Sequence, residues 1–210
     1  MKNTLAIIGS GDLGQQIAHY AISDNHYKKV VFIDDFTSQK TILGYEIIGK
    51  TNDLEILFEQ KIFDEIIIGI GYKHLQIRKE IFNKYNNLVP FGKIVHSTSW
   101  LDPTAKVNPG CVIYPRCSLD ANVVIQENTI LNIATTIAHD TNVGKHCFLS
   151  PRVAIAGFVN IKEQCIIGIN STIIDNIVIC EQVQIGGGTV VIKNTEKKGL
   201  YVGNPAKFIR

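Results

Sequence analysis

The sequence has 210 residues, of which 45% are hydrophobic and 19% charged, a composition typical of a packed globular protein and unlike that of a disordered chain or a coiled coil. Its 21 basic and 19 acidic residues leave a net charge of +2 with no block of like charge, so we expect no nucleic acid and no membrane as partner. The first apolar run, residues 5–8, is too short for a signal-peptide core, and we expect a cytoplasmic protein.

Residues 1–95 alternate apolar stretches with mixed ones. The patterns predict strands over 4–8, 30–33 and 65–70 and helices over 13–22 and 77–85, after which residues 89–95 lead out of the domain. Strands that alternate with helices indicate an α/β domain with a parallel sheet.

Three glycines lie between the first expected strand and the first expected helix. Gly9, Gly11 and Gly14 have the spacing G-x-G-x-x-G, and Asp34 follows Gly14 by twenty residues. Taken alone, this pattern predicts NAD binding. Because about 95 residues hold only half of a dinucleotide-binding fold, a redox role is the weaker alternative.

From residue 99 onward a period of six residues replaces the alternation. Every sixth residue from Leu101 to Val191 is aliphatic, which makes sixteen positions in one unbroken frame. If about a third of all positions were aliphatic, chance would give such a frame roughly once in tens of millions of trials. Two positions earlier, fifteen of the sixteen residues are Ser, Ala, Cys, Val or Thr, which is typical of a site where only a small side chain fits.

This repeat resembles the hexapeptide-repeat family of left-handed parallel β-helices, in which three hexads form one triangular coil. The resemblance implies a division into an α/β domain over 1–95 and a β-helix of about five coils over 96–210, with a short C-terminal tail. An antiparallel β domain is the alternative, but its alternation with period two does not produce a period of six.

The five cysteines fit this repeat. Cys111, Cys117, Cys147 and Cys165 all fall in the register of small residues, so we expect them to fill the core rather than to form disulfides or bind a metal. Cys180 follows an aliphatic position and has no adjacent histidine, so it does not resemble an activated nucleophile.

Residues that are three hexads apart lie above one another on such a coil. We call such a set of stacked residues a column, and in the column of His139 the residue one coil further along is Gly157. The imidazole can act as a base near neutral pH, and the adjacent Asp140 can accept from one ring N–H and raise the basicity of the other nitrogen. Gly157 has no side chain, so its N–H can approach an oxyanion that forms near His139. A surface histidine at a coil corner is the alternative.

A second column leaves a smooth strip along the coils. Gly168 and Gly186 lie in the column of Asn132, and Gly187 lies three hexads after Ile169. A long, thin ligand can lie along this strip. Glycines that only form turns are the alternative, and both interpretations can hold together.

The order of the parts resembles one branch of the hexapeptide family, the bacterial PglD/NeuD-like nucleotide-aminosugar N-acetyltransferases and sialic-acid O-acetyltransferases. In that branch a small Rossmann-like domain precedes the β-helix. The matching motifs span nearly the whole chain and lie at residues 9–14, 32–36, 69–71, 137–140, 168–171, 186–188 and 202–207.

The resemblance implies a role for each matched position. His139 is implied as the base, Asp140 as its modulator and Gly157 as the oxyanion donor. The residues implied to bind the nucleotide-linked amino sugar are Gly11, Asp12, Leu13, Asp34, Asp35 and Gly71, and we also expect Asn132 to bind this substrate. The residues implied to touch acetyl-CoA are Ile169 and Gly187, and we expect Gly168 and Gly186 of the smooth strip to bind the same cofactor.

Two positions depart from this family. Asp12 and Leu13 stand where members often have a small residue or histidine, and a carboxylate beside a pyrophosphate is unfavourable unless it points away. Phe148 stands where some relatives have a histidine that reaches the cofactor, so we expect that contact to be lost.

We therefore predict an acetyltransferase that moves an acetyl group directly from acetyl-CoA to the C4 amine of a dTDP- or UDP-linked 4-amino-4,6-dideoxysugar, for surface polysaccharide or glycan synthesis. The resemblance also implies a homotrimer with active sites between its subunits, and no metal. The alternatives are a sialic-acid-type O-acetyltransferase and a non-catalytic nucleotide-binding scaffold. A zinc-dependent carbonic anhydrase of the same fold would need three converging histidines, but only His139 and His146 lie in well-ordered repeats.

Overall fold

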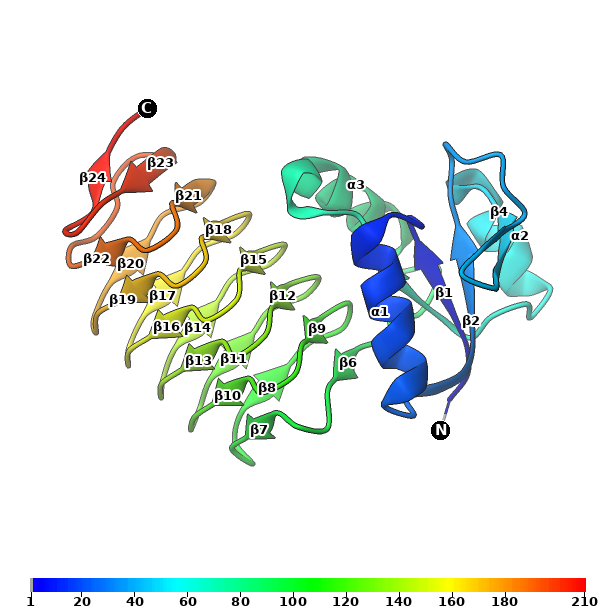
Figure 1. Ribbon diagram of the computed structural model, residues 1–210, viewed down its shortest axis with the longest axis horizontal. Coiled ribbons are helices and arrows are strands. Elements are labelled where there is room, and N and C mark those ends of the chain that lie inside the picture. The colour runs from blue at the N-terminus through cyan, green and yellow to red at the C-terminus, as the bar shows by residue number, and fades with distance from the viewer. Residues whose placement is uncertain (1) are drawn as a thin grey trace. The chain divides into compact units, whose positions relative to one another are not determined.

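The computed structural model describes residues 2–210, which divide into two units after Ile94. The first unit is an α/β domain, and the second, Val95–Arg210, is a stack of short β-strands (Figure 1). Each unit has its own core of buried aliphatic residues. None of the helices in the described part of the chain is both long and apolar enough to span a membrane.

The first unit is built on a five-stranded sheet with the order β3-β4-β2-β1-β5. The three strands expected from the sequence, β1, β2 and β5, pair parallel, and the apolar residues at the end of β1 are buried on both faces of the sheet. The strands are β1 (Lys2–Ile8), β2 (Tyr27–Ile33), β3 (Thr41–Ile42), β4 (Tyr45–Gly49) and β5 (Glu65–Ile68).

Three α-helices accompany this sheet. The buried residues of α1 include Gly14, Ile17, Ala18 and Ala21, whose spacing forms one stripe on the helix. Small residues in this stripe let the helix approach the sheet closely. The helices are α1 (Asp12–Ser23), α2 (Leu54–Glu59) and α3 (Leu75–Tyr85), with 3-10 turns η1 (Thr51–Asp53) and η2 (Tyr72–His74).

The structure differs from the sequence expectations in three places. Strand β5 ends at Ile68 rather than at residue 70, because the chain turns at Gly69 and Gly71. The hairpin of β3 and β4 makes the sheet mixed rather than purely parallel. Helix α2 is a third element that the sequence did not indicate.

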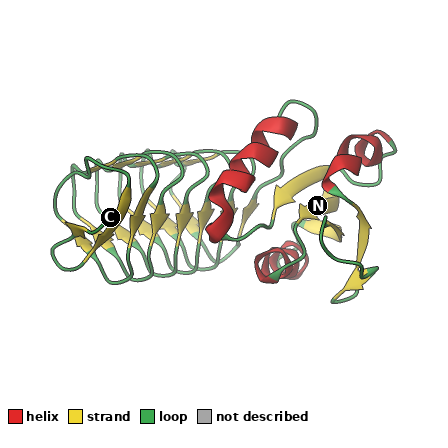
Figure 2. Cartoon of the chain, turned by 90° about the horizontal axis from the view of Figure 1, so that it is seen from above, coloured by secondary structure: helices red, strands yellow, loops and turns green. Residues whose placement is uncertain are grey.

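The second unit is the expected parallel β-helix. Strands that are three hexads apart in the sequence pair in parallel, as Leu119 does with Ile137 and Ile137 with Ile155. The strands therefore form three sheets that run along the coils, and Figure 2 shows the strands of successive coils aligned with loops between them. The strands before the tail are β6 (Ile94–Val95), β7 (Trp100–Leu101), β8 (Lys106–Val107), β9 (Val112–Ile113), β10 (Ser118–Leu119), β11 (Val124–Ile125), β12 (Ile130–Leu131), β13 (Thr136–Ile137), β14 (Asn142–Val143), β15 (Phe148–Leu149), β16 (Ala154–Ile155), β17 (Asn160–Ile161), β18 (Ile166–Ile167), β19 (Thr172–Ile173), β20 (Val178–Ile179), β21 (Val183–Ile185) and β22 (Val190–Val191).

The side chains of both repeating positions, the aliphatic one and the small one, point into the coil. From Val107 to Val191 the aliphatic positions are buried, and so are the small residues two positions earlier from Cys111 to Thr189. Four cysteines are buried as predicted, whereas Cys180 is partly exposed. The small register also supplies hydroxyls that tie neighbouring coils together, since Thr141 Oγ1 donates to the Ala156 carbonyl (3.0 Å) and accepts from the Val159 N–H (3.2 Å).

The corners of the coils repeat with the same period. Every sixth residue from Arg116 to Gln182 has a positive φ, between 55° and 62°. Asparagine, aspartate and histidine tolerate this left-handed conformation better than most residues, and Asn122, Asp140 and His146 are among them. The site residue Asp140 is therefore held at a corner by backbone geometry.

The chain ends in a short hairpin. Strand β23 (Gly199–Val202) pairs parallel with β21, and β24 (Lys207–Phe208) pairs antiparallel with β23. This hairpin continues the sheet of β21 beyond the last coil, so that the edge of β21 is paired.

Candidate active site

The glycines after β1 and β5 allow three backbone segments to pack tightly. A Cβ on Gly14 would lie 2.0 Å from the Gly9 carbonyl oxygen, and a Cβ on Gly69 would lie 2.6 Å from the Gly14 Cα. Because these neighbours are backbone atoms that cannot rotate away, only glycine fits at both positions. The start of α1 is thus held against the ends of β1 and β5.

Gly11 and Gly71 have no such steric requirement. A Cβ on either residue would meet nothing within 4 Å, and their φ values of −70° and −67° suit any residue. Gly11 also precedes the first turn of α1, where unpaired N–H groups and the helix dipole favour an anion. Open space at both glycines therefore suits the close approach of a phosphorylated ligand to the backbone.

Asp34 joins the loop after β1 to the loop after β2. Its Oδ2 accepts from the Ser10 N–H (2.8 Å) and the Ser10 hydroxyl (2.6 Å), and its Oδ1 accepts from the N–H groups of Phe36 (2.9 Å) and Thr37 (3.2 Å). Partial burial acts to raise the pKa of Asp34, but these four hydrogen bonds together lower it below its usual value. Since both carboxylate oxygens are occupied, Asp34 shapes the two loops.

The next two residues differ in their surroundings. The carboxylate of Asp35 accepts from both the N–H (2.8 Å) and the hydroxyl (2.7 Å) of Thr51. Phe36, which the sequence did not single out, is 98% exposed although its backbone is held by Asp34. Asp12 and Leu13 follow Gly11 at the start of α1, where Asp12 is exposed and Leu13 partly buried.

Arg78 is a further residue that the sequence did not single out. Its side chain on α3 is only 1% exposed, and its guanidinium donates to the carbonyls of Ile68 (2.8 Å) and Ile70 (2.9 Å). These two carbonyls flank Gly69 at the end of β5, so Arg78 fixes the turn that leads to Gly71. The signal was present in the sequence, because Arg78 occupies the apolar face of α3 between Leu75 and Phe82.

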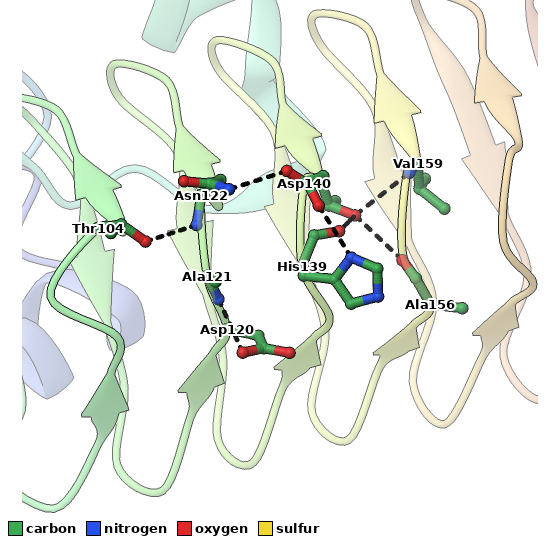
Figure 3. Close-up of polar contacts among 9 residues, drawn as sticks. Thr104, Asp120, Ala121, Asn122, His139, Asp140, Ala156 and Val159 are labelled. Carbon is green, nitrogen blue, oxygen red and sulfur yellow. Dashed lines mark hydrogen bonds and ion pairs between the residues drawn. The ribbon is translucent and has the colours of Figure 1, made fainter.

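In the β-helix, His139 and Asp140 form the expected pair (Figure 3). The distance from His139 Nδ1 to Asp140 Oδ2 is 2.9 Å, and the two side chains are 48% and 36% exposed. The hydrogen bond from His139, and secondly that from Asn122, hold the pKa of Asp140 below its usual value. An ionised carboxylate only accepts, so Nδ1 carries the proton and the lone pair is on Nε2.

Gly157 lies against the imidazole, as the column spacing predicts. A Cβ there would lie 2.8 Å from His139 Cε1 and 2.9 Å from Nε2, so the ring has its place only because residue 157 is glycine. At two other corners the side chains of Asp120 and Asn132 accept the N–H of the following residue, but Ala156 offers no such acceptor to Gly157. Within residues 2–210 the Gly157 N–H has no hydrogen-bond acceptor.

Phe158 adds an aromatic edge to this corner. Its ring is more than half exposed and meets the His139 ring edge to face, with centroids 5.1 Å apart. Phe148, in contrast, is buried, so it does not present a side chain to a ligand on the outside of the coil. The base candidate is therefore bordered by an apolar ring on its own chain.

The glycines of the smooth strip let neighbouring coils pack closely and also leave a low surface on the outside of the β-helix. A Cβ on Gly168 would lie 2.6 Å from backbone atoms of Gly186 and Gly187, and one on Gly186 would lie 2.7 Å from a methyl of Val202. Gly187 faces Ile169, whose side chain is exposed. Gly168 and Gly186 thus let neighbouring coils pack closely, while Ile169 and Gly187 offer an apolar, low surface on the outside.

Asn132 lies at a different corner from His139. Its Oδ1 accepts from the Ile133 N–H (2.8 Å), and no hydrogen bond among the described residues joins it to His139 or Asp140. The structure therefore does not bring Asn132 into the His139 corner of the same coil. No group of three metal-ligating side chains is found in the part of the chain that the structure describes.

Comparisons with known proteins agree with the motifs in both units. Residues 4–85 match the family model described as the PglD N-terminal domain. A curated relative, a GDP-perosamine N-acetyltransferase of Escherichia coli O157:H7, is 25% identical over 209 residues, which cover 96% of this chain and 83% of the relative.

Solved structures show the same fold over the whole chain. The acetyltransferase domain of PglB from Neisseria gonorrhoeae, solved in complex with acetyl coenzyme A, is 26% identical, with a TM-score of 0.91 and full coverage of both chains. PerB from Caulobacter crescentus, in complex with CoA and GDP-perosamine, is 22% identical with a TM-score of 0.89, and the match covers 99% of this chain and 97% of PerB. The expected fold and the resemblance to the PglD/NeuD-like acetyltransferases are both confirmed.

Proposed function

We propose that this chain, whose first unit matches the PglD N-terminal domain, is an acetyl-CoA-dependent N-acetyltransferase that acts on a nucleotide-linked amino sugar. The observation that carries the proposal is the His139–Asp140 pair at a coil corner, with the face of the imidazole lying against Gly157. The relatives named above, an N-acetyltransferase and an acetyl coenzyme A complex, support the reaction class.

The chemical step is direct transfer. His139 Nε2 removes a proton from the sugar amine as the nitrogen attacks the thioester carbonyl. The new C–N bond forms a tetrahedral intermediate, whose collapse breaks the C–S bond, and the CoA sulfur leaves as a thiolate that takes up the proton from His139. No covalent acyl-enzyme is needed, and the described chain offers no activated cysteine near His139, since four of its cysteines are buried in the core.

The oxyanion of this intermediate needs a donor. The Gly157 N–H supports this role, because Gly157 lies against the His139 ring and its N–H has no acceptor within residues 2–210. A backbone donor that is already in place stabilises the developing charge without reorganisation.

Substrate and cofactor would bind at the features described above. Gly11, with the N-terminus of α1, and Gly71 would accept the diphosphate, with Asp12 and Leu13 beside it and the loop that Asp34 and Asp35 shape around the nucleoside. Acetyl-CoA would lie along the strip that ends in Ile169 and Gly187, with Gly168 and Gly186 beneath it.

The finer proposal is that the acceptor is the C4 amine of a 4-amino-4,6-dideoxysugar, linked to dTDP or UDP, for a surface polysaccharide or glycan. The curated relative is named for GDP-perosamine, so a GDP-linked amino sugar is the rival acceptor. We also propose that the chain works as a homotrimer in the cytoplasm.

The test is a screen of dTDP-, UDP- and GDP-linked 4-amino sugars for thiol release from acetyl-CoA. A sialic acid is included as an acceptor to test the alternative of O-acetylation. We expect turnover with one of the amino sugars and a product acetylated at nitrogen by mass spectrometry. Turnover only with sialic acid would replace the N-acetyl proposal, and absence of turnover with every acceptor would support a non-catalytic scaffold. His139→Ala is the matched control, for which kcat falls by about 10²- to 10⁴-fold.

A further inference from the structure

A line of polar side chains leads to His139 across three successive coils (Figure 3). Thr104, Asn122 and Asp140 follow one another at intervals of three hexads and therefore lie in one column. The Asn122 N–H donates to Thr104 Oγ1 (2.8 Å), and Asn122 Nδ2 donates to Asp140 Oδ1 (3.0 Å). Asp140 then receives His139 Nδ1–H on its other oxygen at 2.9 Å.

The direction of each bond in this line is fixed by its neighbours. The Thr104 hydroxyl donates to Asp102 Oδ1 (2.6 Å), so its lone pair is available to the Asn122 N–H. An ionised Asp140 can only accept, so the Asn122 amide must present its NH₂ group to it. The line therefore ends with two donors, one on each oxygen of Asp140.

These two hydrogen bonds restrict an otherwise mobile group. Asp140 is exposed, and an exposed carboxylate with a single partner rotates readily and gains little from its ion pair. With Oδ1 held by Asn122, Oδ2 is the oxygen that faces the His139 ring. A carboxylate fixed in this way keeps the imidazole proton on Nδ1 and leaves Nε2 as the acceptor.

We propose that Asn122 is a positioning residue for the reaction, because its side-chain amide aims Asp140 at Nδ1 and so holds His139 in the tautomer that has its lone pair on Nε2. This inference rests on the proposed function of His139 as the base. Asn122 itself does not touch the reacting atoms. The other titratable groups near this line are Asp120, whose Oδ1 accepts the Ala121 N–H, and Asp175, which lies two coils beyond His139 in its column and pairs with Asn176.

If the role of Asn122 were only structural, this residue would serve to hold its coil corner, where its own φ is 59°. Two substitutions separate the roles. Asn122→Gly keeps the left-handed corner, because glycine adopts it without strain, but removes the amide. Asn122→Asp keeps the size and the tolerance of the corner but replaces the donor with an acceptor that repels Asp140.

The experiment uses the whole protein without substrate, labelled with ¹⁵N-histidine, and reads the His139 tautomer from the two ring-nitrogen shifts, assigned by loss of the signals in His139→Ala. We expect the Nδ1–H form in the native protein and a shift toward the Nε2–H form in both Asn122 variants. Asn176→Gly, the same change three coils further along the column, is the control and leaves the tautomer unchanged. An unchanged tautomer in both Asn122 variants would overturn the proposal.

Kinetics provides the second measurement, with the sugar that the screen identifies. We expect kcat to fall roughly tenfold in both Asn122 variants while the KM for acetyl-CoA stays the same, the size of effect typical of an outer-shell partner. A kcat within twofold of the native value would contradict a role in the reaction. Failure of the proposed function has a different signature: His139→Ala retains activity, or no acceptor turns over, whatever the tautomer measurement shows.

Discussion

The His139 ring has room on the face that lies against residue 157 because that residue is a glycine. Its missing Cβ would lie within 3.2 Å of three ring atoms, Cε1, Nε2 and Nδ1. The His139 side chain is half exposed and can rotate away from an added methyl group, so a larger residue at 157 would change the position of the base more than it would change the stability of the coil.

Gly157→Ala therefore tests the geometry of the base. We expect kcat to fall by at least about tenfold, because misplacing a catalytic group by an ångström has costs of this order or larger. The melting temperature should change little, since φ at Gly157 is not in the left-handed region. Steady-state kinetics and thermal melts check both statements, with Asp175→Ala, in the same column one coil further, as the control. Native kcat in Gly157→Ala would show that the ring position does not limit the reaction.

Asp34 provides a prediction about pH. Its pKa is lower in the folded protein than its ordinary value of 3.8, so its hydrogen bonds to Ser10, Phe36 and Thr37 contribute stability above that value. This contribution is lost as the pH falls through the folded pKa, when the carboxylate takes up a proton. Asp34→Asn should accordingly lower the melting temperature at pH 7, and the gap to the native protein should narrow below pH 3.8.

Thermal melts between pH 7 and pH 2.5 measure this gap. Asp12→Asn is the matched control, since the Asp12 carboxylate makes no hydrogen bond within the described residues. A gap between native protein and Asp34→Asn that stays constant over the whole range would mean that the ionised carboxylate adds no stability.

At the scale of the structural element, the glycine positions of the two units fall into two classes. Gly168 stacks directly on backbone atoms of the next coil, whereas Gly71 is surrounded by open space and has an ordinary φ. A methyl group at 168 can be accepted only if two coils separate, which would break the parallel pairing of β18 with β21. A methyl group at 71 displaces nothing.

Gly168→Ala should lower the free energy of unfolding by about 1–3 kcal/mol, as overpacking against an unyielding neighbour does. Gly71→Ala should leave it unchanged or raise it by about 0.4–1 kcal/mol, because alanine restricts the unfolded chain more than glycine does. Chemical denaturation of both variants measures the difference. Equal stabilities would show that the coils at Gly168 yield more easily than the backbone contacts indicate.

The elements that the sequence predicted well are those with one dominant period. The hexad fixes which residues pair, so the contact of His139 with Gly157 follows from counting three hexads along the chain. The hairpin of β3 and β4 has no comparable period, and its strands are half exposed. The place of Arg78 on the apolar face of α3 signals its burial, but no spacing rule supplies its acceptor, the carbonyl of Ile68. Asn122 was not singled out because its role depends on the carboxylate of Asp140 that its amide reaches.

At the scale of the whole molecule, the remaining question is how a site with an exposed base is completed. One wall of the His139 corner is supplied by Phe158, and Asn132 lies at another corner with no hydrogen bond to His139 or Asp140. If Asn132 serves the same site as His139, as expected from the sequence, it must come from a second copy of the chain. A closed ring of three copies gives each His139 one such neighbour.

The trimer and its shared sites can be tested together. Light scattering should give a mass of about 70 kDa, three times the 23.3 kDa of one chain, since a closed cyclic assembly has a fixed number of copies. His139→Ala and Asn132→Ala should each have low activity. When the two are expressed together in equal amounts, about a quarter of the sites combine an intact His139 with an intact Asn132 from the neighbouring copy, so activity should return to about a quarter of the native value. Activity no higher than that of the two parents would show that each site is built within a single chain.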